Sequence, residues 1–249
     1  MLKKNPAVPD YGIYAPYVVR YLSILGAILL IFGLFGVTSR YGPWIQVQHV
    51  LGRWMLLGCI IVILEAAYMV WGSKVGNRKE RDRVVELLGI TGDELALDVG
   101  CGRGLILHAI AKRLGSGKAV GMDIWNSRDV SGNNPAVTLE NAKLEGVADR
   151  IEIVNGDARA MPFADNSFDA VASGLVIHNI SGDDDRRRAI REVYRVLKPG
   201  GRFAILDFQR TKVYAEEFRK CGAMDVKIHG PHYAMFPPVK IVSGKKAKR

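Results

Sequence analysis

Two long stretches without charge near the N-terminus constrain the fold of this chain more than any other feature. No charged residue lies between Tyr21 and Ser39, and Glu65 is the only one between Trp54 and Ser73. As α-helices these stretches would extend roughly 27–28 Å, close to the hydrocarbon thickness of a bilayer. Both are apolar on every side, which favours membrane-spanning helices over a hairpin buried in a soluble core. A cleaved signal peptide would have a single short apolar run, so two full-length runs argue against one.

The positive charges around the two stretches predict their orientation. Basic residues are sparse in the linking loop and more numerous outside it. They are Lys3, Lys4 and Arg20 before the first stretch, Arg40 and Arg53 near the ends of the loop, and Lys74, Arg78, Lys79, Arg81 and Arg83 after the second stretch. The positive-inside rule therefore places both termini in the cytoplasm. The net charge of +10 allows binding to nucleic acid or to an anionic membrane surface, and the cluster after the second stretch suits lipid head groups.

Individual residues inside the stretches also carry information. Ionisable residues within a span are costly and often functional, so Glu65 could contact a substrate. It lies in the cytoplasmic half of its helix, so it could instead reach the interface or pair with an arginine or tyrosine. Small residues allow membrane helices to pack closely. The candidates for such packing are Gly26, Gly33, Gly36 and Gly58.

From residue 92 onward, strand-like and helix-like segments alternate. The expected strands are 95–99, 119–123, 150–154, 168–173, 202–208, 224–229 and 239–243, and the expected helices are 104–114, 135–145, 184–197 and 212–221. Such alternation predicts an α/β fold with a mostly parallel sheet covered by helices on both faces. Ligands of such sheets bind at the carboxyl ends of the strands.

Three carboxylates lie at or just after the ends of strands, where a nucleoside ligand would need them. Residues 97–104 read LDVGCGRG between a strand and a helix, and glycines there permit a tight turn close to a ligand. The GxGxG spacing differs from the GxGxxG of dinucleotide folds. Asp98 could meet a positively charged amino-acid moiety. Asp123 ends the second strand, where a carboxylate accepts hydrogen bonds from ribose hydroxyls. Asp157 follows the third strand and could accept from an adenine amine.

Together these motifs resemble the class I S-adenosylmethionine-dependent methyltransferases, in particular the small-molecule group that includes ubiquinone/menaquinone and sterol methyltransferases. The resemblance covers about residues 80–245 and rests on LDVGCGRG (97–104), GMD (121–123), NGDARAMPF (155–163), NSFDAVASG (166–174) and RVLKPGGRFAILD (195–207). It implies a seven-stranded sheet with one antiparallel strand, and a methyl group directed at the loop after the fourth strand. The implied cofactor-binding residues are Asp98, Gly100, Gly102, Asp123, Ile124, Asp157, Ala158 and Ser173.

His178, in that loop, is the candidate catalytic residue. A base is needed only where the nucleophile keeps its proton, and imidazole suits that task. The alternative is a packing or helix-capping residue at the rim of the pocket. The loop lacks the Asn/Asp-Pro-Pro-Tyr/Phe element of adenine methyltransferases, and acidic neighbours balance the arginines of 186–188, so nucleic acid is not the expected partner. No metal site is expected. The segment 125–135 is longer and more polar than in related enzymes and could cover the nucleoside or frame the substrate.

The chain is therefore expected to contain a membrane hairpin in residues 1–75, with spans at about 21–39 and 54–72, an S-adenosylmethionine-binding domain in 76–245 and a basic tail in 246–249 that could touch lipid phosphates. The predicted function is a membrane-anchored methyltransferase, with its catalytic domain in the cytoplasm, for a quinone, sterol, isoprenoid or phospholipid-type acceptor. The alternatives are a catalytically silent, nucleoside-binding membrane adaptor and a nicotinamide-dependent oxidoreductase.

Overall fold

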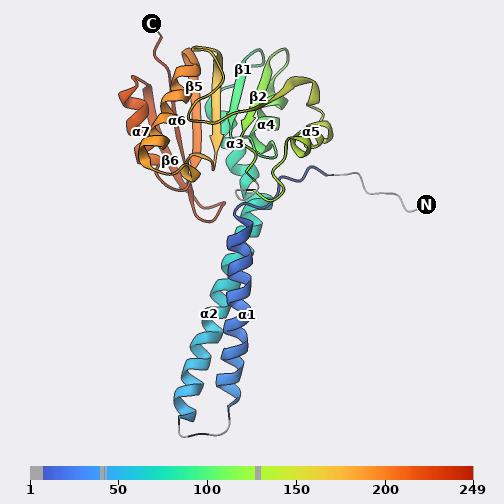
Figure 1. The fold of residues 1–249 in the computed structure, drawn as a ribbon, viewed down its shortest axis with the longest axis vertical. Helices are drawn as coiled ribbons and strands as arrows, with labels where there is room; N and C mark the ends of the chain where they lie inside the picture. The colour runs from blue at the N-terminus through green and yellow to red at the C-terminus, as the bar shows by residue number, and fades with distance from the viewer. Residues whose placement is uncertain (1–7, 40–41, 43, 127–129, 249) are drawn as a thin grey trace, which may run out of the picture.

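A computed structural model describes residues 8–39, 42, 44–126 and 130–248. A long helical hairpin projects from one end of an α/β domain (Figure 1). Its two helices, α1 (Pro16–Thr38) and α2 (Ile45–Trp71), lie side by side. Several residues used in the sequence analysis lie outside the described ranges: Lys3, Lys4, Arg40, residues 127–129 of the predicted insert, and Arg249.

The hairpin is held together by close backbone contact. A Cβ atom on Gly52 would lie 2.7 Å from the backbone nitrogen of Val37. Cβ atoms on Gly33 and Gly36 would lie 2.8 and 2.9 Å from atoms of α2. The expectation of close packing is therefore confirmed for these two glycines and for Gly26, whose Cβ atom would lie 3.1 Å from the side chain of Ile63. Gly52 was missed, and Gly58 makes only an ordinary contact at 3.6 Å.

The side chains of the hairpin are mostly exposed. In the most apolar windows of the two long helical segments, only 11% and 22% of the residues are buried. Large apolar side chains such as Phe35 and Trp54 are 70% and 66% exposed. The hairpin is therefore not buried in the core of the described α/β domain. By length and composition both helices could cross a membrane; that they do so stays a prediction.

The second helix leads into the α/β domain without a break. A π-helical turn, η1 (Gly72–Gly76), joins α2 to α3 (Asn77–Leu88). α3 was not predicted from the sequence, where the basic residues of this segment are the more prominent feature. Its opposite face is apolar, and Val84, Val85 and Leu88 are buried against the domain.

The domain contains a seven-stranded sheet among the described residues, in the order β3-β2-β1-β4-β5-β7-β6. The strands are β1 (Leu95–Val99), β2 (Lys118–Asp123), β3 (Ile151–Asn155), β4 (Phe168–Gly174), β5 (Leu197–Asp207), β6 (Met224–His232) and β7 (Val239–Lys245). β7 is antiparallel to both of its neighbours, and the other pairs are parallel. The expected fold class is confirmed.

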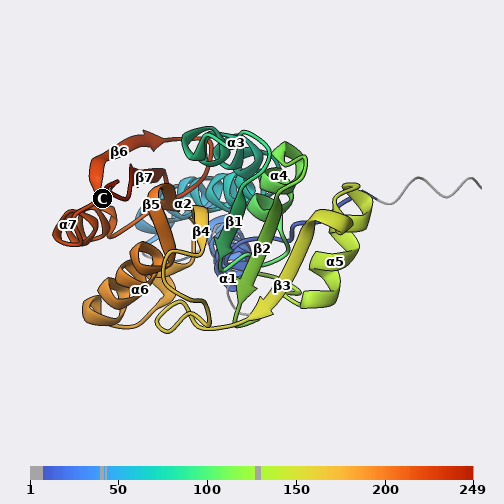
Figure 2. The ribbon, with the colours of Figure 1, turned by 90° about the horizontal axis from the view of Figure 1, so that it is seen from above.

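Helices cover both faces of the sheet (Figure 2). One face packs against α3, α4 (Leu105–Arg113) and α5 (Pro135–Leu144) through residues such as Leu107 and Ile110. The other packs against α6 (Asp183–Val196) and α7 (Thr211–Lys220), where Ile190 and Phe218 are fully buried. Short 3₁₀ turns, η2 (Ala148–Arg150) and η3 (Ile177–Asn179), precede β3 and follow β4.

The two ends of the sheet differ in their surroundings. The loops after β4 and β5 lie at the hairpin, where Leu175 and Phe208 share a cavity with residues of α1 and α2. The C-terminal end of the chain lies at the opposite end of the domain (Figure 1). There the ammonium of Lys246 bonds to the side chain of Asn166 at 2.9 Å. The described part of the basic tail thus lies away from the hairpin, and its contact with lipid phosphates stays a prediction.

Candidate active site

The glycine turn after β1 forms one wall of a cavity at the carboxyl ends of the strands. Gly100 and Gly102 have φ angles of +71° and +52°, which glycine adopts without strain. The backbone N–H groups of Gly100 and Cys101 donate to the carbonyl of Met122 at 2.7 and 3.1 Å, so the turn is fixed to β2. A Cβ atom on Gly100 would collide with Val176, whereas one on Gly102 would meet no atom within 4 Å. The space beside Gly102 is therefore open.

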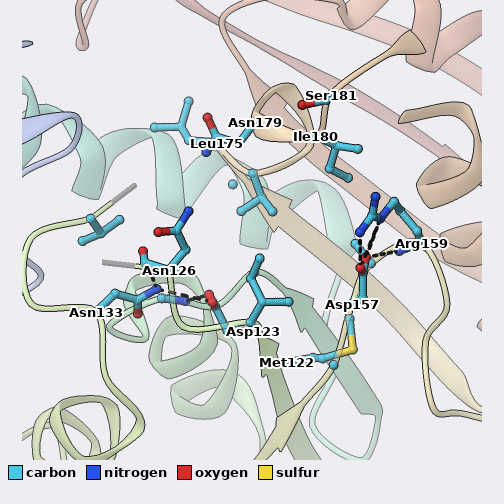
Figure 3. Close-up of a pocket in the computed structure, with 18 residues that line it drawn as sticks. Met122, Asp123, Asn126, Asn133, Asp157, Arg159, Leu175, Asn179, Ile180 and Ser181 are labelled. Carbon is cyan, nitrogen blue, oxygen red and sulfur yellow. Dashed lines mark hydrogen bonds and ion pairs between the residues drawn. The ribbon is translucent and has the colours of Figure 1, made fainter. Parts of the chain in front are cut away.

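This cavity, called here the nucleoside cavity, has a volume of about 350 Å³. Side chains from the ends of β2, β3 and β4 surround it (Figure 3). Six of the eight predicted cofactor-binding residues line it: Gly100, Gly102, Asp123, Ile124, Asp157 and Ala158. The structure thus brings together residues up to 58 positions apart in the sequence, as expected for the carboxyl edge of a parallel sheet.

Asp123 connects the glycine turn to the segment after β2 at the base of the nucleoside cavity. Its Oδ2 accepts a hydrogen bond from the backbone of Gly102 at 2.8 Å, and its Oδ1 accepts from the backbone of Trp125 at 2.6 Å. The amide of Asn133 also donates to Oδ1, at 3.3 Å (Figure 3). A carboxylate has about four acceptor positions, so a ribose hydroxyl could still bond to it.

Asp157 is paired with a residue that the sequence analysis did not identify. The guanidinium of Arg159 contacts both carboxylate oxygens, with a shortest distance of 2.6 Å, and its backbone N–H donates to Oδ1 at 2.8 Å (Figure 3). The Arg159 hydrogen bonds hold the pKa of Asp157 below its usual range. Arg159 also bonds to Asp185 at the start of α6. Arg159 therefore orients the acidic side chain expected at the adenine end of the cavity.

Asp98 lies in a separate small space of about 30 Å³ beside the glycine turn, together with Tyr14. Its side chain is only 2% exposed, and its Oδ1 has no hydrogen-bond partner among the described residues. Burial and, to a smaller extent, the charge of Asp123 raise the pKa of Asp98 to about 7, against the lowering effect of a Leu107 backbone hydrogen bond. A ligand ammonium group would supply the missing donor and the missing positive charge.

A segment before α1 covers this end of the site, and no pattern in the sequence predicted it. Residues 8–15, called here the N-terminal strap, cross the domain and pair with the segment after β2 through an isolated bridge between Tyr14 and Val130. The hydroxyl of Tyr11 donates to Glu145 at 2.5 Å. Asn141 bonds to the strap backbone at 3.0 and 2.9 Å. These long-range contacts close the site from the side of α5.

Ser173 does not line the nucleoside cavity. Its side chain is fully buried, and its hydroxyl donates to the carbonyl of Val99 at 2.8 Å, linking β4 to β1. The resemblance implied that Ser173 binds the cofactor, but side chains alternate in direction along a strand, and this one points into the sheet packing. The structure gives this side chain a role in the sheet instead.

His178 faces a second cavity. Its Nδ1 lies 2.9 Å from Oδ1 of Asp207, although the ring is not oriented for a hydrogen bond, and its backbone N–H donates to Oδ2 of the same carboxylate at 3.2 Å. Asp207 is fully buried and also accepts from Tyr214 at 3.1 Å. The ring of His178 packs edge-on against Phe208, with centroids 4.6 Å apart. His178 is therefore held between a buried carboxylate and an aromatic ring.

The second cavity, called here the acceptor cavity, has a volume of about 520 Å³ and lies between the domain and the near ends of α1 and α2. Its lining is mostly apolar and aromatic, with a few polar groups. The lining residues are Tyr14, Ala15, Tyr17, Val18, Glu65, Met69, Gly72, Ser73, Leu175, His178, Asn179, Phe208, Gln209, Met235, Phe236 and Pro237. Leu175 and Asn179 line both cavities, and Leu175 has the uncommon φ of +58°. The two cavities thus meet at the loop after β4.

The residues present fit the expected cofactor, S-adenosylmethionine. The buried Oδ1 of Asp98 accepts no hydrogen bond from any described residue. It is therefore available to an ammonium group of a ligand. The open space beside Gly102 admits a ligand close to the backbone. Asp123 and Asp157 stand at the ends of adjacent strands, suited to ribose and base. Cofactor and acceptor could meet at Leu175 and Asn179.

Comparisons with known proteins agree with this geometry. Residues 97–205 match the family model described as a methyltransferase domain. The chain is 34% identical over 150 residues to the chloroplastic 2-phytyl-1,4-beta-naphthoquinone methyltransferase of Arabidopsis thaliana, covering 60% of this chain and 55% of the relative. It is 38% identical over 128 residues to a demethylmenaquinone methyltransferase of Staphylococcus aureus, covering 51% and 48%. The chain thus spans about half the length of these curated relatives.

A solved structure supports the fold. The crystal structure of a SAM-dependent methyltransferase from Aquifex aeolicus is similar with a TM-score of 0.53 and 19% identity, covering 66% of this chain and 88% of that chain. At this identity the likeness concerns the fold of the α/β domain.

Proposed function

We propose that the protein transfers a methyl group from S-adenosylmethionine to a hydrophobic, quinone-type acceptor at a membrane. The match of residues 97–205 to a methyltransferase domain model supports this proposal. The observation that carries the proposal is the pair of cavities that meet at Leu175 and Asn179. One is lined by carboxylates at strand ends, and the other is apolar and opens beside the hairpin.

The cofactor would be held by groups of this chain at three points. Asp98 would bind the ammonium of the methionine moiety, Asp123 the ribose hydroxyls, and Asp157 with Ala158 the adenine. When bound, S-adenosylmethionine supplies a methyl group already activated on a sulfonium, so the protein mainly positions the reactants and excludes water. The N-terminal strap would serve the second purpose, because Tyr14 lines both the space beside Asp98 and the acceptor cavity.

The acceptor would lie among aromatic and aliphatic side chains, with its reactive atom near Asn179. A volume of about 520 Å³ falls in the range of pockets for small organic ligands. The names of both curated relatives refer to naphthoquinone-type compounds, which supports a ring of that type as the acceptor. If the acceptor carries a hydroxyl proton, His178 would take it at Nε2, because Nδ1 faces Asp207.

The hairpin would anchor the enzyme where such an acceptor is dissolved. Its exposed apolar surface requires a nonaqueous environment, and its length matches a bilayer. Arg20 on α1 and the basic residues of α3 lie on the side of the α/β domain, so the positive-inside rule supports a cytoplasmic domain. Tethering confines enzyme and acceptor to one surface and raises their rate of encounter.

Untargeted mass spectrometry of membrane lipids tests the proposal. Lipids from cells that express the full chain, compared with cells that lack it, should contain an apolar species heavier by one methyl group. Cells that express Gly102→Asp serve as the control and should lack that species. Binding of S-adenosylmethionine without any methylated lipid would refute methyl transfer and favour the nucleoside-binding adaptor.

A further inference from the structure

Glu65 is the one charged residue of α2 that lies in its apolar core, and it faces the acceptor cavity. It sits six residues, roughly 9 Å, before the end of α2 at Trp71. Its side chain is half-buried, and neighbouring parts of the lining come from Tyr17 and Val18 on α1 and from Met69 one turn later on α2. Glu65 therefore belongs to the wall that the hairpin contributes to the cavity.

The carboxylate of Glu65 is free to accept hydrogen bonds from a ligand. Among the residues that the structure describes, no side chain forms a hydrogen bond or ion pair with it. A charged group in an apolar span is costly, and such groups persist where they face a cavity and serve a ligand. Of the other polar residues in the lining, His178, Asn179 and Gln209 belong to loops of the α/β domain, whereas Tyr14, Tyr17 and Ser73 belong to the strap, α1 and η1. The cavity thus has polar groups on its domain wall and one carboxylate on its hairpin wall.

The segment between β6 and β7 also lines the acceptor cavity, and contacts with α2 and α3 hold it in place. The hydroxyl of Tyr68 donates to the carbonyl of Tyr233, and the Tyr68 ring lies 5.8 Å from that of Phe236. His232 lies 2.7 Å from the buried carboxylate of Glu80. The segment between β6 and β7 is therefore held against α2 and α3 at these points.

Resting on the proposed function, we propose that α2 is part of the acceptor site and that Glu65 determines acceptor specificity by accepting a hydrogen bond from a hydroxyl group on the acceptor ring. A carboxylate accepts hydrogen bonds and cannot donate them, so it selects a ring with a hydroxyl at this end over one whose oxygen is capped. The apolar tail of the acceptor would lie along the exposed surface of the hairpin. The hairpin is then a component of the binding site as well as an anchor.

Equilibrium binding to the full chain in detergent, without S-adenosylmethionine, tests this inference. The probes are a reduced 2-prenyl-1,4-naphthoquinone, which carries two ring hydroxyls, and its dimethyl ether. Glu65→Leu should weaken binding of the diol at least tenfold and leave binding of the ether unchanged. Glu65→Gln retains an acceptor oxygen and should restore most of the affinity for the diol. The matched control is Leu64→Gln, because Leu64 is 63% exposed and does not line the cavity; it should bind both probes like the wild type.

Two results would overturn the role of Glu65. One is unchanged binding of the diol by Glu65→Leu. The other is an equal loss of affinity for diol and ether, which would indicate that the substitution only changes the shape of the cavity. Affinity for S-adenosylmethionine, measured in parallel, should be the same in all variants. Failure of the proposed function gives a different result, since the wild type would then bind the diol through Glu65 but transfer no methyl group to any lipid.

Discussion

Gly102→Asp should strongly weaken cofactor binding at a modest cost in stability, and Gly146→Asp provides a matched control. Gly102 and Gly146 have φ angles of +52° and +69°, and a Cβ atom on either would meet no atom within 4 Å. The left-handed backbone costs a non-glycine residue about 1–2 kcal/mol at each site. Both variants should therefore lower the melting temperature by roughly 2–8 °C.

The two variants differ in what the new side chain faces. Gly102 lines the nucleoside cavity, whereas Gly146 lies in the turn after α5 and lines none of the cavities described above. A ligand that buries the new carboxylate of Gly102→Asp without a partner costs about 2–3 kcal/mol. That cost corresponds to a loss of affinity of roughly 30- to 150-fold.

Isothermal titration calorimetry with S-adenosylmethionine measures the difference on the purified full chain. Gly146→Asp should bind like the wild type, and Gly102→Asp should show the predicted loss. Similar affinity in Gly102→Asp and the wild type would refute the placement of the cofactor against the glycine turn. A similar loss in both variants would show that backbone strain, and not the cavity, controls binding.

Three further substitutions test other parts of the site. The pKa of Asp98 in the folded protein, about 7, exceeds its unfolded value of about 3.9, so its contribution to stability is present below pH ~4 and is lost as the pH rises to 7. Asp98→Asn should therefore raise the melting temperature at pH 8 and weaken S-adenosylmethionine binding at least tenfold; melting curves and calorimetry measure both, and unchanged affinity would contradict the ammonium contact. His178→Gln should reduce the single-turnover rate roughly 100-fold or more if His178 is the base, with cofactor affinity unchanged, whereas a wild-type rate would leave His178 only a packing role. Tyr11→Phe removes the hydrogen bond to Glu145 and should lower the free energy of opening the N-terminal strap by about 1–3 kcal/mol. Amide exchange in the strap should therefore be faster, and unaltered exchange would show that other contacts hold the strap.

The sequence predicted the parts of the fold that depend on local patterns. Strand and helix boundaries follow from short apolar runs and from turn residues, and the observed β1 coincides with its predicted range. The glycine turn was predictable because Gly100 and Gly102 occupy backbone conformations that other residues avoid. Asp123 and Asp157 were predictable because a parallel sheet places the ends of its strands along one edge.

The remaining parts of the site depend on contacts between residues far apart in the chain. Tyr14 reaches the site only because the N-terminal strap pairs with the segment after β2. Arg159 had no distinguishing pattern in the sequence, although its position two residues after Asp157 is a common spacing for local pairing. The role of Glu65 could not be decided from the sequence, because the acceptor cavity is formed by α1, α2 and the segment between β6 and β7 together.

The proposed methyl transfer to a lipid can be measured directly with a tritiated methyl group. The purified full chain would be reconstituted in vesicles made from a membrane lipid extract and supplied with methyl-labelled S-adenosylmethionine. Tritium should appear in an apolar, quinone-type lipid with the wild type, with none above background for Gly102→Asp. Label that enters only protein or nucleic acid, or no transfer by a chain that binds the cofactor, would contradict the proposed transfer.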